Sequence, residues 1–447
     1  MYPYPITGMR TAHLSLVIFS LLSSTSATFQ PSGAPFKSPV VVGQGLVADV
    51  IFSNLTAPRG IAFDSLGNLL VVERGFGVTA FSPATGGYNR DVVIPNTGFT
   101  HGIQVDGKNL YVSTAGSVIL YDYDASSKSV SSLTGRVLIN GIPPDGELTT
   151  HTLQIEFVNG SAVGLLVGSG PLTNIDETAR DPSSGRSQVR RFPLLSPVSP
   201  ATPLPWSSGR VIAYGIRNPA GFAFSPASAV TQGLYIVENG ASIDNVTGLT
   251  PAFVNDNPAD ELEILAPGVS SSALPKFFGF PDCSTLWNPQ ADPSGVPQYV
   301  GDHRGDQFSL HLDPVRDDQW CRQKNNNAPP KLSFQAHSVP LDIKFYLGPQ
   351  PTQASQKKPL PTAFVGDSFV SFHGSFDRNP PTGYGVVRIP RVPSTSSALG
   401  YEFIVQAKNL LSCPGTCIRP VGLAFRTDGR LFVSSDSSGE LFVLSGA

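Results

Sequence analysis

Histidine and arginine side chains recur at the ends of short apolar runs along this chain of 447 residues. A neutral imidazole can act as a general base, and guanidinium groups bind carboxylates in a bidentate way. A single histidine beside a strand is more often a hydrogen-bonded turn residue. The repetition instead favours a shared polar site for an anionic cofactor and an oxidisable or hydrolysable substrate. The recurring positions are His101, His151, His337, His373, Arg74, Arg217 and Arg378.

The turn Glu238-Asn239-Gly240-Ala241 offers a second kind of ligand. Backbone carbonyl oxygens in such a turn suit a hard cation such as calcium. The sequence therefore predicts a candidate calcium position that accompanies the cationic residues.

The elements that must position these residues form a unit that the chain repeats six times. A short apolar strand follows a Pro, His or Asn turn, and a second strand comes next. Such a unit cannot bury both faces alone, so successive units must stack, and the closed all-β arrangement is a six-bladed β-propeller. The first strands are expected at Pro58–Phe63, His101–Val105, His151–Ile155, Asn218–Phe224, Pro340–Phe345 and Pro420–Phe425. The second strands are expected at Leu69–Glu73, Leu110–Thr114, Leu165–Gly168, Leu234–Glu238, Phe369–His373 and Leu431–Ser434.

A propeller brings the candidate residues to one place. The chain enters the innermost strand of a blade and leaves the second strand at the same face. Residues just before each first strand and just after each second strand are therefore expected to surround one central mouth, which is the default position for a binding site.

Strand spacing predicts how the ring closes. Few strand-like runs follow Pro420, whereas Leu46–Phe52 precedes the first unit. This N-terminal strand is expected to complete the last blade and protect its edge. The stretch from Thr250 to Pro330 is much longer than the other connections. It predicts one long inter-blade insertion in a single propeller domain that spans residues 28–447.

Residues 1–27 have the pattern of a secretion signal. Arg10 precedes the apolar run Leu14–Leu22, which is too short to span a bilayer, and Thr25-Ser26-Ala27 offers a cleavage site. No second long apolar run follows, so the product is expected to be secreted, extracellular and not attached to a membrane. Sequons for N-glycosylation begin at Asn54, Asn159 and Asn245.

The four cysteines fit an oxidising compartment. Cys413 and Cys417 flank a short turn that brings them close enough to bridge, and Cys283 and Cys321 then pair by elimination. The alternative is a metal cluster, which is disfavoured because no cysteine has the two-residue spacing to a second ligand that zinc sites prefer.

The charge balance limits the class of partner. Lys and Arg total 30 against 33 Asp and Glu, which gives a formal net charge of −3. Nucleic-acid binding usually needs a basic surface, so no nucleic-acid partner is expected.

Six motifs carry a resemblance to a known family: Tyr214–Phe224, Val237–Gly240, Asn257–Leu262, Phe278–Cys283, His373–Arg378 and Gly383–Arg388. They resemble, in order along the chain, the sorbosone and soluble glucose dehydrogenase superfamily. With the secretion signal, the chain is most similar to fungal pyrroloquinoline-quinone-dependent pyranose dehydrogenases. The resemblance implies a six-bladed propeller that holds the quinone and a calcium ion at its mouth. It also implies oxidation of the anomeric hydroxyl of pyranose sugars or related keto-aldoses.

The resemblance implies a role for each candidate position. His151 would take the proton of the anomeric hydroxyl, and Arg217 would face the developing oxyanion of the quinone while also binding it. Calcium would lie against Gly240 and Ala241 and act as a Lewis acid. Asp260 and Glu261 would bind a second, structural calcium or form a solvated acidic pair. The other cofactor contacts would be Arg74, His101, Asn218, His337, His373 and Arg378.

The resemblance also implies the partners. Some fungal relatives carry a haem-binding cytochrome domain, but both methionines here, Met1 and Met9, lie in the signal. The chain is therefore expected to be a stand-alone dehydrogenase for a monosaccharide. It would pass electrons to an external acceptor, either a small quinone or a redox protein such as a cytochrome or a copper oxygenase.

Two other functions are compatible with a six-bladed propeller but fit these residues less well. A calcium-dependent lactonase or paraoxonase-like hydrolase on a six-bladed propeller needs several Asn, Asp or Glu side chains on the axis, whereas this rim is rich in His and Arg. A non-catalytic glycan-binding propeller would have little use for a cluster of buried arginines.

Overall fold

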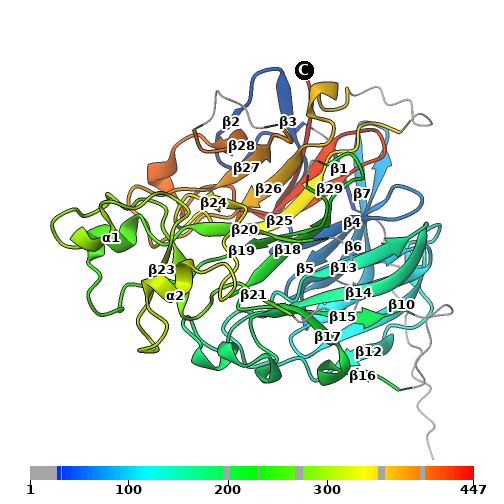
Figure 1. Cartoon of the computed structure of the whole chain (residues 1–447). Coiled ribbons are helices and arrows are strands. Elements are labelled where there is room, and N and C mark those ends of the chain that lie inside the picture. The colour runs from blue at the N-terminus through cyan, green and yellow to red at the C-terminus, as the bar shows by residue number, and fades with distance from the viewer. Residues whose placement is uncertain are drawn as a thin grey trace, which may run out of the picture.

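The computed structural model describes residues 28–31, 33–194, 202–229, 231–266, 275–350, 358–392 and 398–447. The signal expected in residues 1–27 lies outside them. The strands form the sheets of a six-bladed propeller, which confirms the predicted fold (Figure 1). No described helix is long and apolar enough to cross a membrane.

Each blade contains four antiparallel strands. From the first blade to the last, the innermost strands are β4 (Pro58–Phe63), β8 (Phe99–Asp106), β13 (Leu153–Val158), β18 (Pro219–Phe224), β25 (Pro340–Phe345) and β29 (Pro420–Phe425). The second strands are β5 (Leu69–Glu73), β9 (Asn109–Thr114), β14 (Ser161–Ser169), β19 (Leu234–Glu238), β26 (Ser368–Phe372) and β30 (Leu431–Ser435). The third strands are β6 (Gly77–Ala84), β10 (Ser117–Asp124), β15 (Gln188–Pro193), β20 (Asp260–Leu265), β27 (Gly385–Ile389) and β31 (Glu440–Gly446). The outer strands are β7 (Gly87–Pro95), β12 (Arg136–Asn140), β17 (Arg210–Tyr214), β24 (Leu332–Phe334), β28 (Glu402–Ala407) and β3 (Leu46–Phe52).

Smaller elements decorate the blades. The additional strands are β1 (Thr28–Pro31), β2 (Val40–Val42), β11 (Ser129–Val130), β16 (Leu204–Pro205), β21 (Lys276–Phe277) and the hairpin of β22 (Cys283–Thr285) with β23 (Gln307–Ser309). The α-helices are α1 (Pro251–Asn255) and α2 (Asp318–Arg322). Single 3₁₀ turns lie at Glu177–Arg180, Pro182–Ser184, Trp206–Ser208, Pro297–Tyr299, Thr362–Phe364 and Leu410–Ser412.

The core is divided among the interfaces between neighbouring blades. Successive side chains of a strand point to opposite faces of its sheet. On β5, Leu69 and Val71 accordingly pack with Phe432 of the last blade, whereas Leu70 and Val72 pack with the second blade. A blade therefore buries both faces only because it has a neighbour on each side, which is why the ring must close.

The predicted closure is confirmed. β3 pairs with β31 in an antiparallel register that runs from Leu46 opposite Gly446 to Phe52 opposite Leu441. The segment before β3 adds a strap across the closure. β1 pairs with β7 of the first blade, Lys37 donates through its Nζ to the Ser438 carbonyl of the last blade, and β2 pairs with β28 of the fifth blade.

The long insertion differs from its expected position. The stretch from Thr250 to Pro330 was expected to lie between two blades, but it contains β20, the third strand of the fourth blade, and it leads back to β24 of the same blade. Glu261 and Glu263 are buried on β20, and these charged residues interrupt the apolar pattern by which a strand is recognised. The insertion, with α1, β23 and α2, projects to one side of the blades (Figure 1).

Both predicted disulfides are confirmed. Cys283 of β22 is bonded to Cys321 of α2 within the insertion, and Cys413 is bonded to Cys417 ahead of β29. The described chain contains no free cysteine.

Candidate active site

A cleft with a volume of about 410 Å³ opens where loops of the third to fifth blades meet. The loops before β18 and β25 and the loops after β19 and β26 contribute to its wall. The structure brings four of the predicted site residues to this cleft: Arg217, Gly240, Ala241 and His337.

Arg217 is fixed in the cleft wall by oxygen atoms of neighbouring loops. It is 7% exposed, and its Nε and Nη2 donate to the carbonyl oxygen and Oδ1 of Asn174, each at 2.9 Å. Its Nη1 donates to the Gly240 carbonyl at 3.1 Å. No hydrogen bond joins the guanidinium to a carboxylate of the described residues. The positive charge therefore remains available for an anionic ligand.

Asp260 holds the Gly240 turn in place through hydrogen bonds to backbone amides. Oδ1 of Asp260 accepts a hydrogen bond from the Gly240 amide at 2.8 Å, and Oδ2 accepts one from the Val339 amide at 2.7 Å. Burial raises the pKa of Asp260 to about 6. Asp260 therefore joins two loops of the cleft wall. The Gly240 carbonyl already accepts from Arg217, so part of its capacity to bind a cation is used.

Asn218 lies behind the cleft in a buried network. Its Nδ2 donates to Oδ1 of Asn239 at 2.6 Å, and its Oδ1 accepts from the Thr150 hydroxyl at 3.0 Å. Both polar groups of the side chain are engaged within the protein, and Asn218 thereby connects the third and fourth blades.

His151 is held between two backbone carbonyl groups. Its Nδ1 lies 3.0 Å from the Gly168 oxygen and its Nε2 lies 2.8 Å from the Ala115 oxygen. His151 is 1% exposed; of the two residues that supply the carbonyl groups, Gly168 is buried and Ala115 is half-buried. Burial lowers the pKa of His151, and the two carbonyl groups oppose that shift.

His101 lies in a more positive environment. Its Nδ1 is buried and has no hydrogen-bond partner among the described residues. Burial lowers the pKa of His101 well below its ordinary value, and Arg59 and Lys344 lower it further. The lowered pKa favours the neutral form of the ring, and Nδ1 is an unused nitrogen atom.

His373 belongs to a charged cluster beside the cleft. Its Nε2 lies 2.9 Å from Asp436, which also forms an ion pair with Arg59 at 2.7 Å. Arg419 donates to the carbonyl groups of His373 and Gly374. Burial alone would raise the pKa of Asp436, but His373 and Arg59 hold it below its ordinary value. The cluster leads into the loop whose Ser375 lines the cleft.

The predicted cofactor contacts Arg74, His337 and Arg378 differ in their exposure and in their position relative to the cleft. Arg74 is exposed and forms no ion pair within the described ranges, although it acts electrostatically on His101. His337 is half-buried at the cleft, and its Nε2 lies 3.0 Å from the Val254 carbonyl. Arg378 is not among the lining residues. It forms an ion pair with Asp256 beyond α1, which neutralises its charge.

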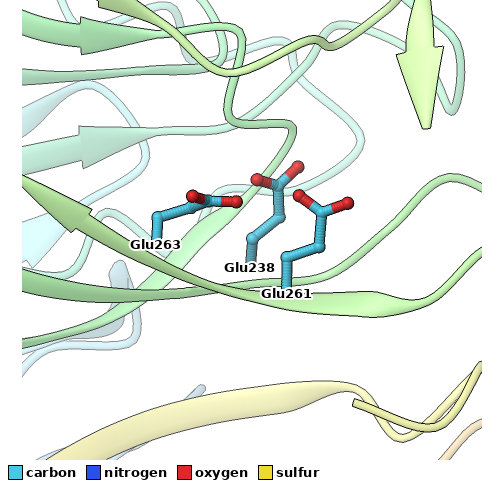
Figure 2. Close-up of side chains that lie close together, drawn as sticks. All are labelled: Glu238, Glu261 and Glu263. Atoms are coloured by element: carbon cyan, nitrogen blue, oxygen red, sulfur yellow. The ribbon is translucent and has the colours of Figure 1, made fainter. Parts of the chain in front are cut away.

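Three buried carboxylates, one of which is Glu238 at the start of the Gly240 turn, lie close together (Figure 2). Glu238 ends β19, Glu261 lies opposite it on β20, and Glu263 follows on the same face; one oxygen of each lies within 4.8 Å of the others. Oε2 of Glu238 and both oxygens of Glu263 have no hydrogen-bond partner in the part of the chain that the structure describes. Burial raises the pKa of all three residues, and the charge of Glu261 raises the pKa of Glu238 and Glu263 further.

The sequence interpretation missed five residues of these clusters. Arg419 directly precedes β29 and Asp436 directly follows β30, so the positional rule used for the histidines would have found both, whereas Arg59 is the second residue of β4 and falls outside that rule. Glu238 and Glu263 could have been found as acidic residues at positions of β19 and β20 that the blade buries.

Two curated proteins match nearly the whole chain. A pyrroloquinoline quinone-dependent sugar dehydrogenase of Hypocrea jecorina is 31% identical over 97% of this chain and 96% of its own length. A pyrroloquinoline quinone-dependent pyranose dehydrogenase of Coprinopsis cinerea is 32% identical over 90% of this chain. The match covers 54% of that protein, so this chain spans about half its length.

Solved structures agree with these matches. The calcium structure of the Trichoderma reesei Carbohydrate-Active Enzymes Family AA12 protein has a TM-score of 0.78 and 32% identity, and the match covers 93% of this chain and 98% of that chain. The holo form of the pyranose dehydrogenase PQQ domain of Coprinopsis cinerea has a TM-score of 0.77 and 30% identity, with 92% and 98% covered. The TrAA12-like family matches residues 40–447. The chain therefore belongs to the TrAA12-like family of pyrroloquinoline quinone-dependent sugar dehydrogenases.

Proposed function

We propose that this protein oxidises the anomeric hydroxyl of a pyranose sugar or a related keto-aldose, with pyrroloquinoline quinone and calcium as cofactors. The observation that carries the proposal is the polar cleft around the carbonyl-anchored Arg217, together with the arginines near Asp436 and the buried His101. Secretion and electron transfer to an external acceptor belong to the same proposal. The two disulfides support the extracellular location.

The residues present fit the anionic quinone. Nε of Arg59 and Nδ1 of His101 are buried without partners among the described residues, and buried polar atoms of this kind point to a missing ligand. Arg59, Arg419 and exposed Arg74 would meet its carboxylates, and Arg217 would stabilise negative charge on its ring oxygen. When bound, the quinone supplies the acceptor for the hydride that leaves C1 of the sugar.

His151 is the proton acceptor in this proposal. A hydrogen bond from Nδ1–H to the Gly168 carbonyl would fix the tautomer, which leaves the lone pair on Nε2. The Ala115 carbonyl lies 2.8 Å from Nε2, so the anomeric hydroxyl would have to displace this contact to deliver its proton to Nε2. His101 is the alternative base, but its neighbouring cations make it the weaker proton acceptor.

The three clustered carboxylates fit calcium better than the carbonyl groups of Gly240 and Ala241 alone. Calcium prefers several oxygen ligands, including carboxylates, and the unpartnered oxygens of Glu238 and Glu263 provide them. Asp260 and Glu261 are predicted either to bind a second, structural calcium or to form a solvated acidic pair. Both side chains are buried, so the pair is not solvated, and Asp260 is committed to the amides of Gly240 and Val339. A calcium ion held by the three glutamates would brace the turn that forms the cleft wall.

Reconstitution tests the proposal. The purified protein would be mixed with pyrroloquinoline quinone and calcium chloride, and reduction of a dye would be followed with a series of pyranoses. Dye reduction that depends on both quinone and sugar is expected. Hydrolysis of a lactone with calcium alone, without sugar-dependent dye reduction, would instead establish the rival hydrolase.

A further inference from the structure

Phe376 is an exposed aromatic ring at the edge of the cleft. It is 77% exposed, and it is the one phenyl ring among the described residues that line the cleft. Single exposed apolar residues are common on protein surfaces, so exposure alone has no functional meaning. Phe376, however, lies in the same cleft wall as Arg217 and the Gly240 turn, so its exposed ring can contact a ligand bound in the cleft.

Hydrogen bonds hold the loop that carries Phe376 on both sides of that residue. Tyr384 donates from its hydroxyl to the Ser375 carbonyl at 2.8 Å, and Arg419 donates to the Gly374 carbonyl at 2.5 Å. On the other side, Asp377 accepts a hydrogen bond from the Ser242 hydroxyl at 3.0 Å. The backbone is therefore fixed on both sides of a side chain that packs against little of the protein. This arrangement prepares an apolar surface for a ligand at little cost in conformational entropy.

The surroundings of the ring select the kind of ligand. Glu147, Asp244 and Asp377 line the same cleft, and their side chains accept hydrogen bonds but repel anions. A pyranose fits these neighbours because it is uncharged, has hydroxyl donors around its edge and presents C–H groups on its face. A quinone with several carboxylates fits the arginines around Asp436 better than this acidic rim.

We propose that Phe376 is a substrate-contact residue whose ring packs against the C–H face of the pyranose, while the acidic rim accepts hydrogen bonds from the hydroxyl groups. This inference rests on the proposed function and assigns its substrate binding to one side chain. The ring binds the sugar in the ground state and the transition state alike, so its removal changes KM and leaves kcat unchanged.

The test compares variants of the holoenzyme reconstituted with quinone and calcium. Phe376→Ala should raise KM for pyranoses about two- to tenfold, the size expected for one lost aromatic contact. The value of kcat and the dissociation constant of the quinone, measured by titration, should stay within about twofold of wild type, because the proposed contact involves only the sugar. Phe376→Trp should retain the wild-type KM. Phe157→Ala is the matched control, because Phe157 is 49% exposed but does not line the cleft.

The outcomes separate this inference from the function on which it rests. An unchanged KM in Phe376→Ala would overturn the substrate contact, as would a loss of quinone affinity that matches the change in KM. A wild-type holoenzyme that oxidises no pyranose would overturn the proposed function instead.

Discussion

A histidine can act as a base only when one of its ring nitrogens carries a lone pair. At His151, two backbone carbonyl groups determine which ring nitrogen carries it. The carbonyl groups of Gly168 and Ala115 lie at the two nitrogens, so the neutral ring can donate to only one of them. The other carbonyl then faces a lone pair, and this contact becomes favourable only after protonation. The arrangement therefore favours proton uptake in a position where burial alone would oppose it.

Replacing His151 by Ala should lower kcat by roughly 10²–10⁴-fold, the usual contribution of a positioned base. Burial lowers the pKa of His151, and a base is active when unprotonated. The activity of the wild type should therefore rise with pH through a midpoint that lies below about pH 6.5, the ordinary pKa of histidine. Steady-state kinetics of kcat/KM against pH with a saturating dye would show this limb in wild type.

His101→Ala is the matched comparison, because each histidine lies near the start of an innermost strand: His101 within β8 of the second blade, and His151 two residues before β13 of the third. It should change the affinity for the quinone more than the acidic limb of the pH profile. Near-normal turnover in His151→Ala, with a large loss in His101→Ala, would transfer the role of the base to His101.

At the scale of elements, closure of the ring depends on one strand that comes from the opposite end of the chain. β3 supplies the outer strand of the last blade, and without it β31 would expose a row of unpaired backbone groups. The strap formed by β1, Lys37 and β2 lies over this closure but does not complete a blade. Removal of β3 and removal of the strap should therefore have different consequences.

A chain that begins at Ser53 should lose cooperative melting or aggregate through the bared edge. A chain that begins at Gly43 keeps β3 and should still melt cooperatively, at a lower Tm. Thermal unfolding followed by circular dichroism, with light scattering for aggregation, distinguishes the two. If the chain that begins at Ser53 melts like the full chain, the ring does not need β3.

At the scale of the whole molecule, the buried glutamates link stability to pH and to calcium. Burial raises the pKa of Glu238 and Glu263 well above the ordinary value, so the folded chain keeps protons that the unfolded chain releases above about pH 4.3. The unfolded state then binds fewer protons than the folded state. The free energy of unfolding without a cation should therefore fall as pH rises through this range.

Calcium should remove this loss, because it replaces the protons as the positive charge among the three carboxylates. At a free concentration 100 times its dissociation constant, it should add about 2.7 kcal/mol to the free energy of unfolding. Denaturation at pH 5 and pH 8, in EDTA or in calcium chloride, provides the measurement. Glu263→Gln should weaken both the pH dependence and the response to calcium. Equal stability of the wild type in EDTA and in calcium at pH 8 would contradict the site.

The sequence by itself determined the number of blades and the positions of their inner strands. The predicted strands Pro58–Phe63, Leu69–Glu73 and Pro340–Phe345 coincide with β4, β5 and β25, because a turn residue followed by a short apolar run is a local signal. The same signal did not predict β20, because Glu261 and Glu263 stand where a buried strand usually has apolar residues. Only the folded blade shows that these two residues cluster with Glu238.

The partners of the polar side chains were decided by the tertiary structure alone. The partner of Arg378 is Asp256, which lies 122 residues away, and the carbonyl group at Nε2 of His151 belongs to Ala115 of the preceding blade. These contacts join loops of different blades, and no periodicity or spacing along the chain records which loops will meet. Local patterns define strands because neighbouring residues share one backbone. A binding site depends on distances that exist only after the blades have closed into a ring.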